Sequence, residues 1–263
     1  MSDPSNSWFW RPDASERAEL RLFCFPYAGG TAHIYRDWEK HLPPTIEVLP
    51  VQLPGRGPRL REPSFVSVWD LVKALTTAIT PLMDRPFAFF GHSMGAVIAF
   101  ELARSVRQRF ACEPEVLCVS GRQAPQVPND KSPSYNLPND EFIAELQRID
   151  GTPREVLEHA ELMELVVPML RADFQLVQTY QYEAGAPLAC PIAAYGGLED
   201  NEVPRELLSM WRGQTTSGFA LHMLPGGHFF LRSSQTLLLK MLARQLQETL
   251  AGSRISKKSK TRR

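Results

Sequence analysis

The fold is decided by residues 87–95, whose sequence is Phe-Ala-Phe-Phe-Gly-His-Ser-Met-Gly. The Gly-x-Ser-x-Gly pattern is typical of a sharp turn between a strand and a helix, where glycines permit a strained backbone that lifts a serine hydroxyl above a sheet. Such a turn needs a strand before it and a helix after it. Apolar residues 87–90 predict the strand, and the spacing of apolar residues over 96–107 predicts the helix. The sequence therefore predicts that Ser93 is a nucleophile.

Short apolar runs on both sides of this turn predict a mainly parallel sheet. Each run is bounded by glycine or proline, and together they cover residues 20–25, 48–53, 87–90, 116–119, 191–195 and 219–224. Helical spacing lies between or after several of them, over residues 68–83, 96–107 and 236–250. Strands that alternate with helices indicate an α/β fold with helices on both faces of the sheet. We therefore predict one domain over residues 20–250, after an N-terminal extension over 1–19.

The interval between the fourth and fifth predicted strands contains no strand-like run. Its first part is rich in Pro, Asn and Ser and is predicted as a loop, and the remainder has helical spacing over residues 140–149, 153–165 and 169–182. Asn139 or Asp140 is the expected N-cap of the first of these helices. We interpret residues 122–186 as a helical lid over one end of the sheet. The apolar residues between 163 and 170 are expected mainly to pack within it.

Composition places the chain among folded proteins without a membrane span. Of its 263 residues, 43% are hydrophobic and 22% are charged, unlike the composition of disordered chains. No segment approaches the run of about 18 apolar residues that a membrane-spanning helix needs. The polar start, residues 1–7, lacks the features of a signal peptide, so we expect a cytoplasmic protein with no membrane contact. The four cysteines form no CxxC pair and are predicted to be buried thiols rather than metal ligands.

Charge is balanced overall but unevenly distributed. The chain has 29 basic and 29 acidic residues, and residues 251–263 hold six of the basic ones and no acidic one. The remaining 23 basic and 29 acidic residues give residues 1–250 a net charge of −6. We predict that 251–263 is a basic, disordered tail without a role in the chemistry, and we expect no nucleic-acid partner.

A serine hydroxyl reacts only when a base takes its proton and a carboxylate orients that base, and the elbow pattern predicts the chain order Ser, acid, His. His228 suits the base, because it follows the last predicted strand in a glycine-containing loop. Asp200, in the loop after the fifth predicted strand, is the predicted acid, with Glu199 as its local rival. His92 is expected to pack, because neighbours on an elbow point apart. Asp173 lies in the insertion and is expected to pair with a basic residue.

Acyl transfer also needs N–H donors for the developing oxyanion. The backbone N–H of Met94, directly after the serine, is the first predicted donor. The second should come from the loop after the first strand, where Pro26 has no N–H; of Tyr27 and Ala28 we favour Ala28. The nearby glycines form neither a GxGxxG nor a Walker pattern, so no cofactor and no metal are predicted.

Several segments together resemble the type II thioesterases, stand-alone α/β-hydrolases that serve fatty acid, polyketide and nonribosomal peptide synthases. The resemblance spans roughly residues 20–245, in the family's order, and is carried by residues 25–30, 53–57, 61–63, 86–95, 120–122, 171–173, 211–212 and 225–230. It implies an α/β-hydrolase fold with a lid, and a triad of Ser93, Asp200 and His228. It also implies an oxyanion hole formed by Ala28 and Met94.

The resemblance further implies substrates that are acyl groups, thioester-linked to the phosphopantetheine arm of an acyl or peptidyl carrier protein. Serine attack would form an acyl-enzyme that water then hydrolyses, which clears stalled or misprimed carriers. The family's usual acid loop has an aspartate pair, of which Glu199 replaces one member. The alternatives are an acyltransferase that uses the same acyl-enzyme, a carboxylesterase, and a non-catalytic carrier-binding module. A monomer is expected.

Overall fold

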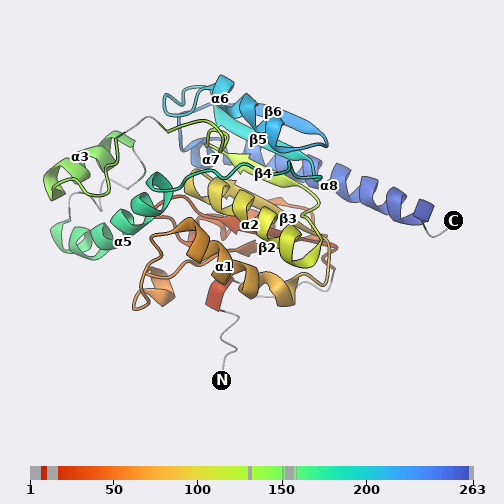
Figure 1. Ribbon diagram of the computed structural model, residues 1–263, viewed down its shortest axis with the longest axis horizontal. Coiled ribbons are helices and arrows are strands. Elements are labelled where there is room, and N and C mark those ends of the chain that lie inside the picture. The colour runs from red at the N-terminus through yellow and green to blue at the C-terminus, as the bar shows by residue number, and fades with distance from the viewer. Residues whose placement is uncertain are drawn as a thin grey trace.

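The computed structural model describes residues 7–10, 17–129, 132–149, 151, 157 and 159–260. All six predicted strands are present, and every neighbouring pair is parallel, in the order β2-β1-β3-β4-β5-β6 (Figure 1). Their bounds are β1 Leu20–Phe25, β2 Ile46–Pro50, β3 Phe87–His92, β4 Leu117–Ser120, β5 Ile192–Gly197 and β6 Phe219–Leu224. The predicted α/β-hydrolase sheet is therefore confirmed.

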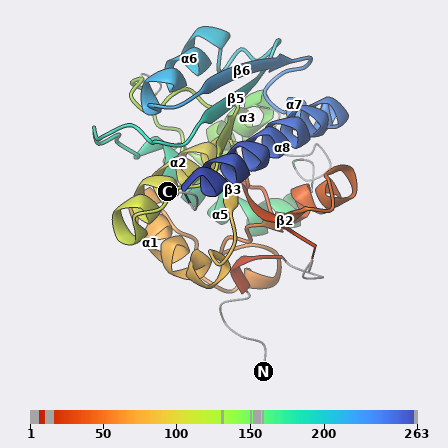
Figure 2. The same ribbon diagram turned by 90° about the vertical axis from the view of Figure 1, so that its right-hand side faces the viewer.

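Helices cover both faces of this sheet. Successive strand residues point to opposite faces, so each strand contributes side chains to two separate cores. Phe23 and Phe89 face the core under α1 (Val68–Ile79) and α2 (Met94–Phe110). Leu22, Cys24 and Phe90 face the second core with α8 (Gln235–Lys260) and the short 3₁₀ helices Ala32–Tyr35 and Trp38–His41. Figure 2 shows α1 and α8 on opposite sides of the sheet.

The insertion contains α3 (Asn139–Ile149) and α5 (Ala160–Gln178), which pack on each other around Phe142, Leu146, Leu170 and Phe174. Two helices were expected where α5 is a single one with Pro168 inside it. Pro168 lies on the exposed side of α5, where water can replace the hydrogen bond that proline cannot donate.

The start of α3 and part of the insertion differ from the sequence expectations. Asn139 is itself the first residue of α3, and the Phe142 N–H donates to the Pro138 carbonyl at 2.9 Å, so neither Asn139 nor Asp140 is an N-cap outside the helix. Residues 153–156 and 158, which belong to the predicted helix 153–165, lie outside the described residues.

The structure adds detail to the two predictions about the ends of the chain. Phe9 forms an antiparallel bridge with Val51 and is 4% exposed, so residues of the predicted extension pack on the domain. The predicted tail is helical up to Lys260, since α8 continues past residue 250 and projects from the body of the molecule (Figure 1). Apart from Gly252 the sequence there holds no strong helix breaker, and basic residues suit a helix C-terminus. Residues 261–263 lie outside the described part.

The sequence also predicts four buried cysteines and no membrane-spanning helix. Cys24, Cys118 and Cys190 are buried, whereas Cys112 is only partly buried, which corrects the prediction for that thiol. Cys112 follows the left-handed residue Ala111 that ends α2, a position close to the surface. Within the described residues, no helix is both long and apolar enough to cross a bilayer.

Candidate active site

Ser93 lies at the turn between β3 and α2 with φ 52° and ψ −112°, a backbone conformation that residues other than glycine rarely adopt. Both flanking glycines are required. A Cβ on Gly91 would lie 2.0 Å from the Gly95 carbonyl oxygen, and a Cβ on Gly95 would lie 2.1 Å from the Phe25 carbonyl oxygen. The turn therefore holds Ser93 at the carboxyl ends of the strands, as the sequence pattern predicts.

The structure brings Asp200 and His228 together. His228 Nδ1 lies 2.9 Å from Asp200 Oδ2, and the other carboxylate oxygen accepts the N–H groups of Glu202 and Val203 at 2.9 and 3.2 Å. The Asp200 side chain is fully buried. Because the carboxylate is fixed by three hydrogen bonds, it orients the imidazole with Nε2 as the remaining ring nitrogen.

The acid and base loops pack directly on each other. A Cβ on Gly197 would lie 2.4 Å from the carbonyl oxygens of Gly226 and Gly227, and the Glu199 N–H donates to the Gly226 carbonyl at 3.0 Å. Glu199 is exposed, whereas Asp200 points inward to His228. The geometry therefore favours Asp200 over Glu199 as the acid.

Comparing Asp200→Asn with Glu199→Gln tests this choice. Asn favours the wrong imidazole tautomer, so kcat of Asp200→Asn is expected to fall about 10⁴-fold, while the exposed Glu199→Gln changes kcat little. Steady-state thioester hydrolysis by both purified variants is the measurement. A larger loss in Glu199→Gln would assign the acid to Glu199.

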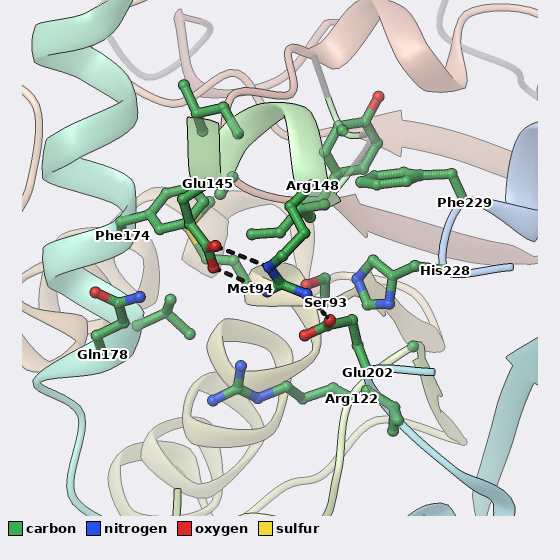
Figure 3. Close-up of a pocket in the computed structure, with 18 of the residues that line it drawn as sticks. Ser93, Met94, Arg122, Glu145, Arg148, Phe174, Gln178, Glu202, His228 and Phe229 are labelled. Atoms are coloured by element: carbon green, nitrogen blue, oxygen red, sulfur yellow. Dashed lines mark hydrogen bonds and ion pairs between the residues drawn. The ribbon is translucent and has the colours of Figure 1, made fainter. Parts of the chain in front are cut away.

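Ser93 and His228 line one cavity of about 1090 Å³, a volume that includes the part open to solvent. Figure 3 shows the Ser93 hydroxyl beside the His228 ring. Among the described residues no hydrogen bond joins these two side chains, and contacts of this kind often tighten only when substrate binds. The positions suit proton transfer from the serine to the histidine.

The predicted oxyanion donors face the same cavity, which Ala28 and Met94 also line. Met94 begins α2, so its N–H is one of the first-turn donors without an acceptor inside the helix. In the loop after β1, the N–H of Gly30 donates to the Tyr27 carbonyl and that of Gly29 to Asp173. The N–H of Ala28 forms no hydrogen bond with any described residue, so it is available to a ligand.

A buried ion pair ties α5 of the insertion to this loop. Arg56 donates to both carboxylate oxygens of Asp173 at 2.6 and 2.7 Å, and also to the Gly30 carbonyl. The same Asp173 carboxylate accepts the Gly29 N–H at 2.7 Å. Asp173 therefore pairs with a basic residue, as predicted. The pair also holds the loop beside Ala28: Asp173 accepts the N–H of Gly29, and Arg56 donates to the carbonyl of Gly30.

The charged residues Glu145, Arg148 and Glu202, which line the cavity, were not singled out from the sequence. Arg148 on α3 bonds Glu145 and reaches Glu202, in the loop after Asp200, at 2.5 Å (Figure 3). Of the apolar residues between 163 and 170, only Leu170 lines the cavity, next to Phe174. Spacing along the helix could indicate which lid residues are apolar, but not which of them face Ser93.

His92 is fully buried beneath the site, as the packing prediction expects. Its Nδ1 lies 2.9 Å from Ser120 Oγ, and its ring contacts those of Tyr27, His228 and Phe229. Burial, with smaller contributions from His228 and Arg232, lowers the pKa of His92 well below its ordinary value. The imidazole is therefore neutral in the folded protein at physiological pH.

The burial of neutral His92 predicts a loss of stability in mild acid. An unfolded histidine has a pKa of about 6.5, so below that pH the unfolded chain binds a proton that the folded chain excludes. We expect the Tm to fall from pH 7 to pH 5, and to fall less in His92→Asn, with about 2–4 °C for each kcal/mol of lost stability. Thermal unfolding of both proteins across this range is the measurement. Parallel curves would show that His92 does not contribute.

Known proteins are similar to this chain in sequence and in fold. A family model described as Thioesterase domain matches residues 20–246. Gramicidin S biosynthesis protein GrsT of Aneurinibacillus migulanus is 45% identical over 246 residues, which cover 94% of this chain and 96% of that protein. Thioesterase PikA5 of Streptomyces venezuelae is 39% identical, over 86% of this chain and 81% of that protein.

Solved structures agree. The type II thioesterase BorB from the borrelidin biosynthetic cluster has a TM-score of 0.85 at 34% identity, with 93% of this chain and all of that chain covered (100%). These matches confirm the resemblance found in the sequence. The chain belongs to the thioesterase family and is a thioester hydrolase of the type II class.

Proposed function

We propose that this thioesterase releases acyl groups from the phosphopantetheine arm of acyl or peptidyl carrier proteins in a polyketide or nonribosomal peptide synthase. The observation that carries the catalytic part is the 2.9 Å contact between His228 and Asp200 at the wall of the cavity that Ser93 also lines. GrsT is a gramicidin S biosynthesis protein and BorB comes from the borrelidin biosynthetic cluster, which supports a carrier-protein partner for this chain.

In the first proposed step, His228 Nε2 takes the proton of the Ser93 hydroxyl while Ser93 Oγ attacks the thioester carbonyl carbon. The carbonyl oxygen becomes an oxyanion that accepts the N–H groups of Ala28 and Met94. The carbon–sulfur bond then breaks, and His228 returns the proton to the departing pantetheine thiolate. The acyl group is left as an ester on Ser93.

In the second step, His228 Nε2 takes a proton from a water molecule, whose oxygen attacks the ester carbonyl. The same N–H groups stabilise the second oxyanion, and Ser93 leaves with the proton from His228. These steps use only groups of this chain, the substrate and water, so we propose that no cofactor or metal takes part. We also propose that the protein acts as a cytoplasmic monomer.

The proposed role is editing: removal of stalled or wrongly primed acyl groups so that the synthase can resume. It is tested with holo carrier protein loaded with acetyl, butyryl or octanoyl groups. Intact mass spectrometry should show conversion to the free thiol by the wild type and not by Ser93→Ala. An acyl group that stays on the carrier would overturn carrier specificity. Acyl transfer to an added alcohol or amine in preference to water would favour the acyltransferase alternative.

A further inference from the structure

Arg122 is a cation whose backbone is held firmly at the cavity wall. It follows β4 through Gly121, which has φ 57° and donates its N–H to the Tyr195 carbonyl at 2.9 Å. Trp211 Nε1 donates to the Arg122 carbonyl at 2.8 Å. The residue lines the same cavity as Ser93. The base of the side chain therefore has a fixed position relative to the nucleophile.

The guanidinium of Arg122 has no partner in the described part of the chain. No hydrogen bond or ion pair involves its nitrogens, whereas the other arginine of the cavity, Arg148, is bonded to Glu145 and Glu202 at 2.5–2.8 Å. Burial lowers the pKa of Arg122 to about 10, which leaves it charged at neutral pH. The Arg122 side chain is half-buried and lines the cavity, so its unpaired N–H donors are available to a ligand oxygen.

The strand order places Arg122 across Ser93 from the oxyanion donor Ala28. Ser93 follows β3, Ala28 follows β1 on one side of it, and Arg122 follows β4 on the other side. A carbonyl oxygen that binds Ala28 and Met94 therefore points away from β4. Figure 3 shows the Arg122 side chain extending toward Gln178 of the lid helix α5.

The cavity that Arg122 lines has polar residues such as Gln178 and also apolar residues that suit an acyl chain. Phe174 and Val177 of α5 and Leu146 of α3 line the cavity that Arg122 also lines. Apolar side chains suit the methylene groups of a chain, and one unpaired guanidinium among them suits an oxygen carried on that chain. A purely alkyl chain would cover Arg122 and leave its donors unsatisfied.

We propose that Arg122 binds an oxygen of the acyl group beyond the thioester, with a carboxylate preferred to a ketone. It is thereby a specificity residue for oxygen-bearing acyl chains over alkyl chains of equal length. Guanidinium forms paired, charge-assisted hydrogen bonds with a carboxylate, and a ketone oxygen accepts weaker ones. The inference rests on the proposed hydrolysis of acyl thioesters at Ser93.

The test uses thioesters of N-acetylcysteamine, which carries no phosphate. The four acyl groups each have six carbons: hexanoyl, 3-oxohexanoyl, 5-oxohexanoyl and adipoyl. For the wild type, kcat/KM of at least one oxygen-bearing thioester should exceed that of hexanoyl by about tenfold, equivalent to about 1.4 kcal/mol. Arg122→Met should abolish this ratio, and Arg122→Lys should retain part of it. Because the ratio compares an oxygen-bearing thioester with the hexanoyl thioester in the same variant, a change in kcat/KM that is common to the two substrates cancels.

Arg205→Met is the matched control, since it removes the same charge from an exposed position at the start of the short helix α6 (Arg205–Ser209) and should keep the wild-type ratio. If Arg122→Met does not fold, Arg122→Leu replaces it. An equal ratio in the wild type and the Arg122 variants would overturn the inference.

The same variants are assayed with the matching coenzyme A thioesters, which carry the pantetheine phosphate. A loss confined to these substrates and equal for all acyl groups would assign Arg122 to that phosphate and also overturn the inference. Failure of the wild type to hydrolyse any thioester would overturn the proposed function and the inference together. Hydrolysis without a ratio that depends on Arg122 overturns the inference alone.

Discussion

Ser93→Ala is expected to lower kcat for thioester hydrolysis by about 10⁶-fold, because the three members of a catalytic triad act as a unit and removal of the nucleophile alone has nearly the effect of removing all three. His228 and Asp200 would still form their 2.9 Å contact in this variant, but there would be no oxygen to acylate. Single-turnover kinetics with an acyl thioester, together with a mass spectrum of the protein, measures both the rate and the absence of an acyl-enzyme.

The control for this variant is Ser93→Gly. It also lacks the hydroxyl, but it relieves the positive φ of 52° at this position, a kind of strain that costs about 1–3 kcal/mol. Both variants should be inactive, and Ser93→Gly should unfold at the higher temperature. Turnover by Ser93→Ala near the wild-type rate would contradict the acyl-enzyme mechanism. Equal unfolding temperatures would show that the turn is unstrained.

Asp173→Ala is expected to destabilise the fold by about 3–5 kcal/mol, because it leaves a buried charge without its partner. Arg56 is 3% exposed and would keep only its bonds to backbone carbonyls, while the Gly29 N–H would lose its acceptor. Unfolding in urea, followed by circular dichroism, measures the change in the free energy of unfolding.

Two comparisons define the effect of Asp173→Ala. The double variant Arg56→Met with Asp173→Leu replaces the pair by apolar side chains and should recover much of the lost stability. Asp37→Ala removes one member of the exposed Asp37–Lys40 pair and should change stability little. If Asp173→Ala were as stable as Asp37→Ala, the pair between Arg56 and Asp173 would not hold the lid helix to the loop.

The sheet and the turn at Ser93 could be predicted because their signals are local. Each strand is a short apolar run that ends at a glycine or proline, and Gly91 and Gly95 are needed by close backbone approaches within a few residues or to the adjacent strand. Ser93, Asp200 and His228 occur in this order because they follow β3, β5 and β6, whose carboxyl ends lie at the same edge of the sheet. The patterns therefore locate the site before any contact is known.

The remaining features depend on contacts between distant residues. Asp173 was expected to find a basic partner, but nothing in the spacing indicates Arg56, which is 117 positions away. That Arg122 lacks a partner depends on where every nearby carboxylate lies after folding. The sequence does not predict the single helix α5, because a proline such as Pro168 usually ends a helix. Pro168 is tolerated here because it lies on the exposed side of α5, which is a property of the tertiary structure.

The order of the strands also bears on protein synthesis. The ribosome makes the N-terminal residues of a chain first, and a domain generally folds as a unit. β1, β2, β3 and the turn that carries Ser93 belong to the part of the chain that is made first. β5 and β6, whose loops carry Asp200 and His228, follow only after the whole insertion has been translated. A nascent chain therefore has a nucleophile without a base, and its catalytic chemistry begins only when the last strand has joined the sheet.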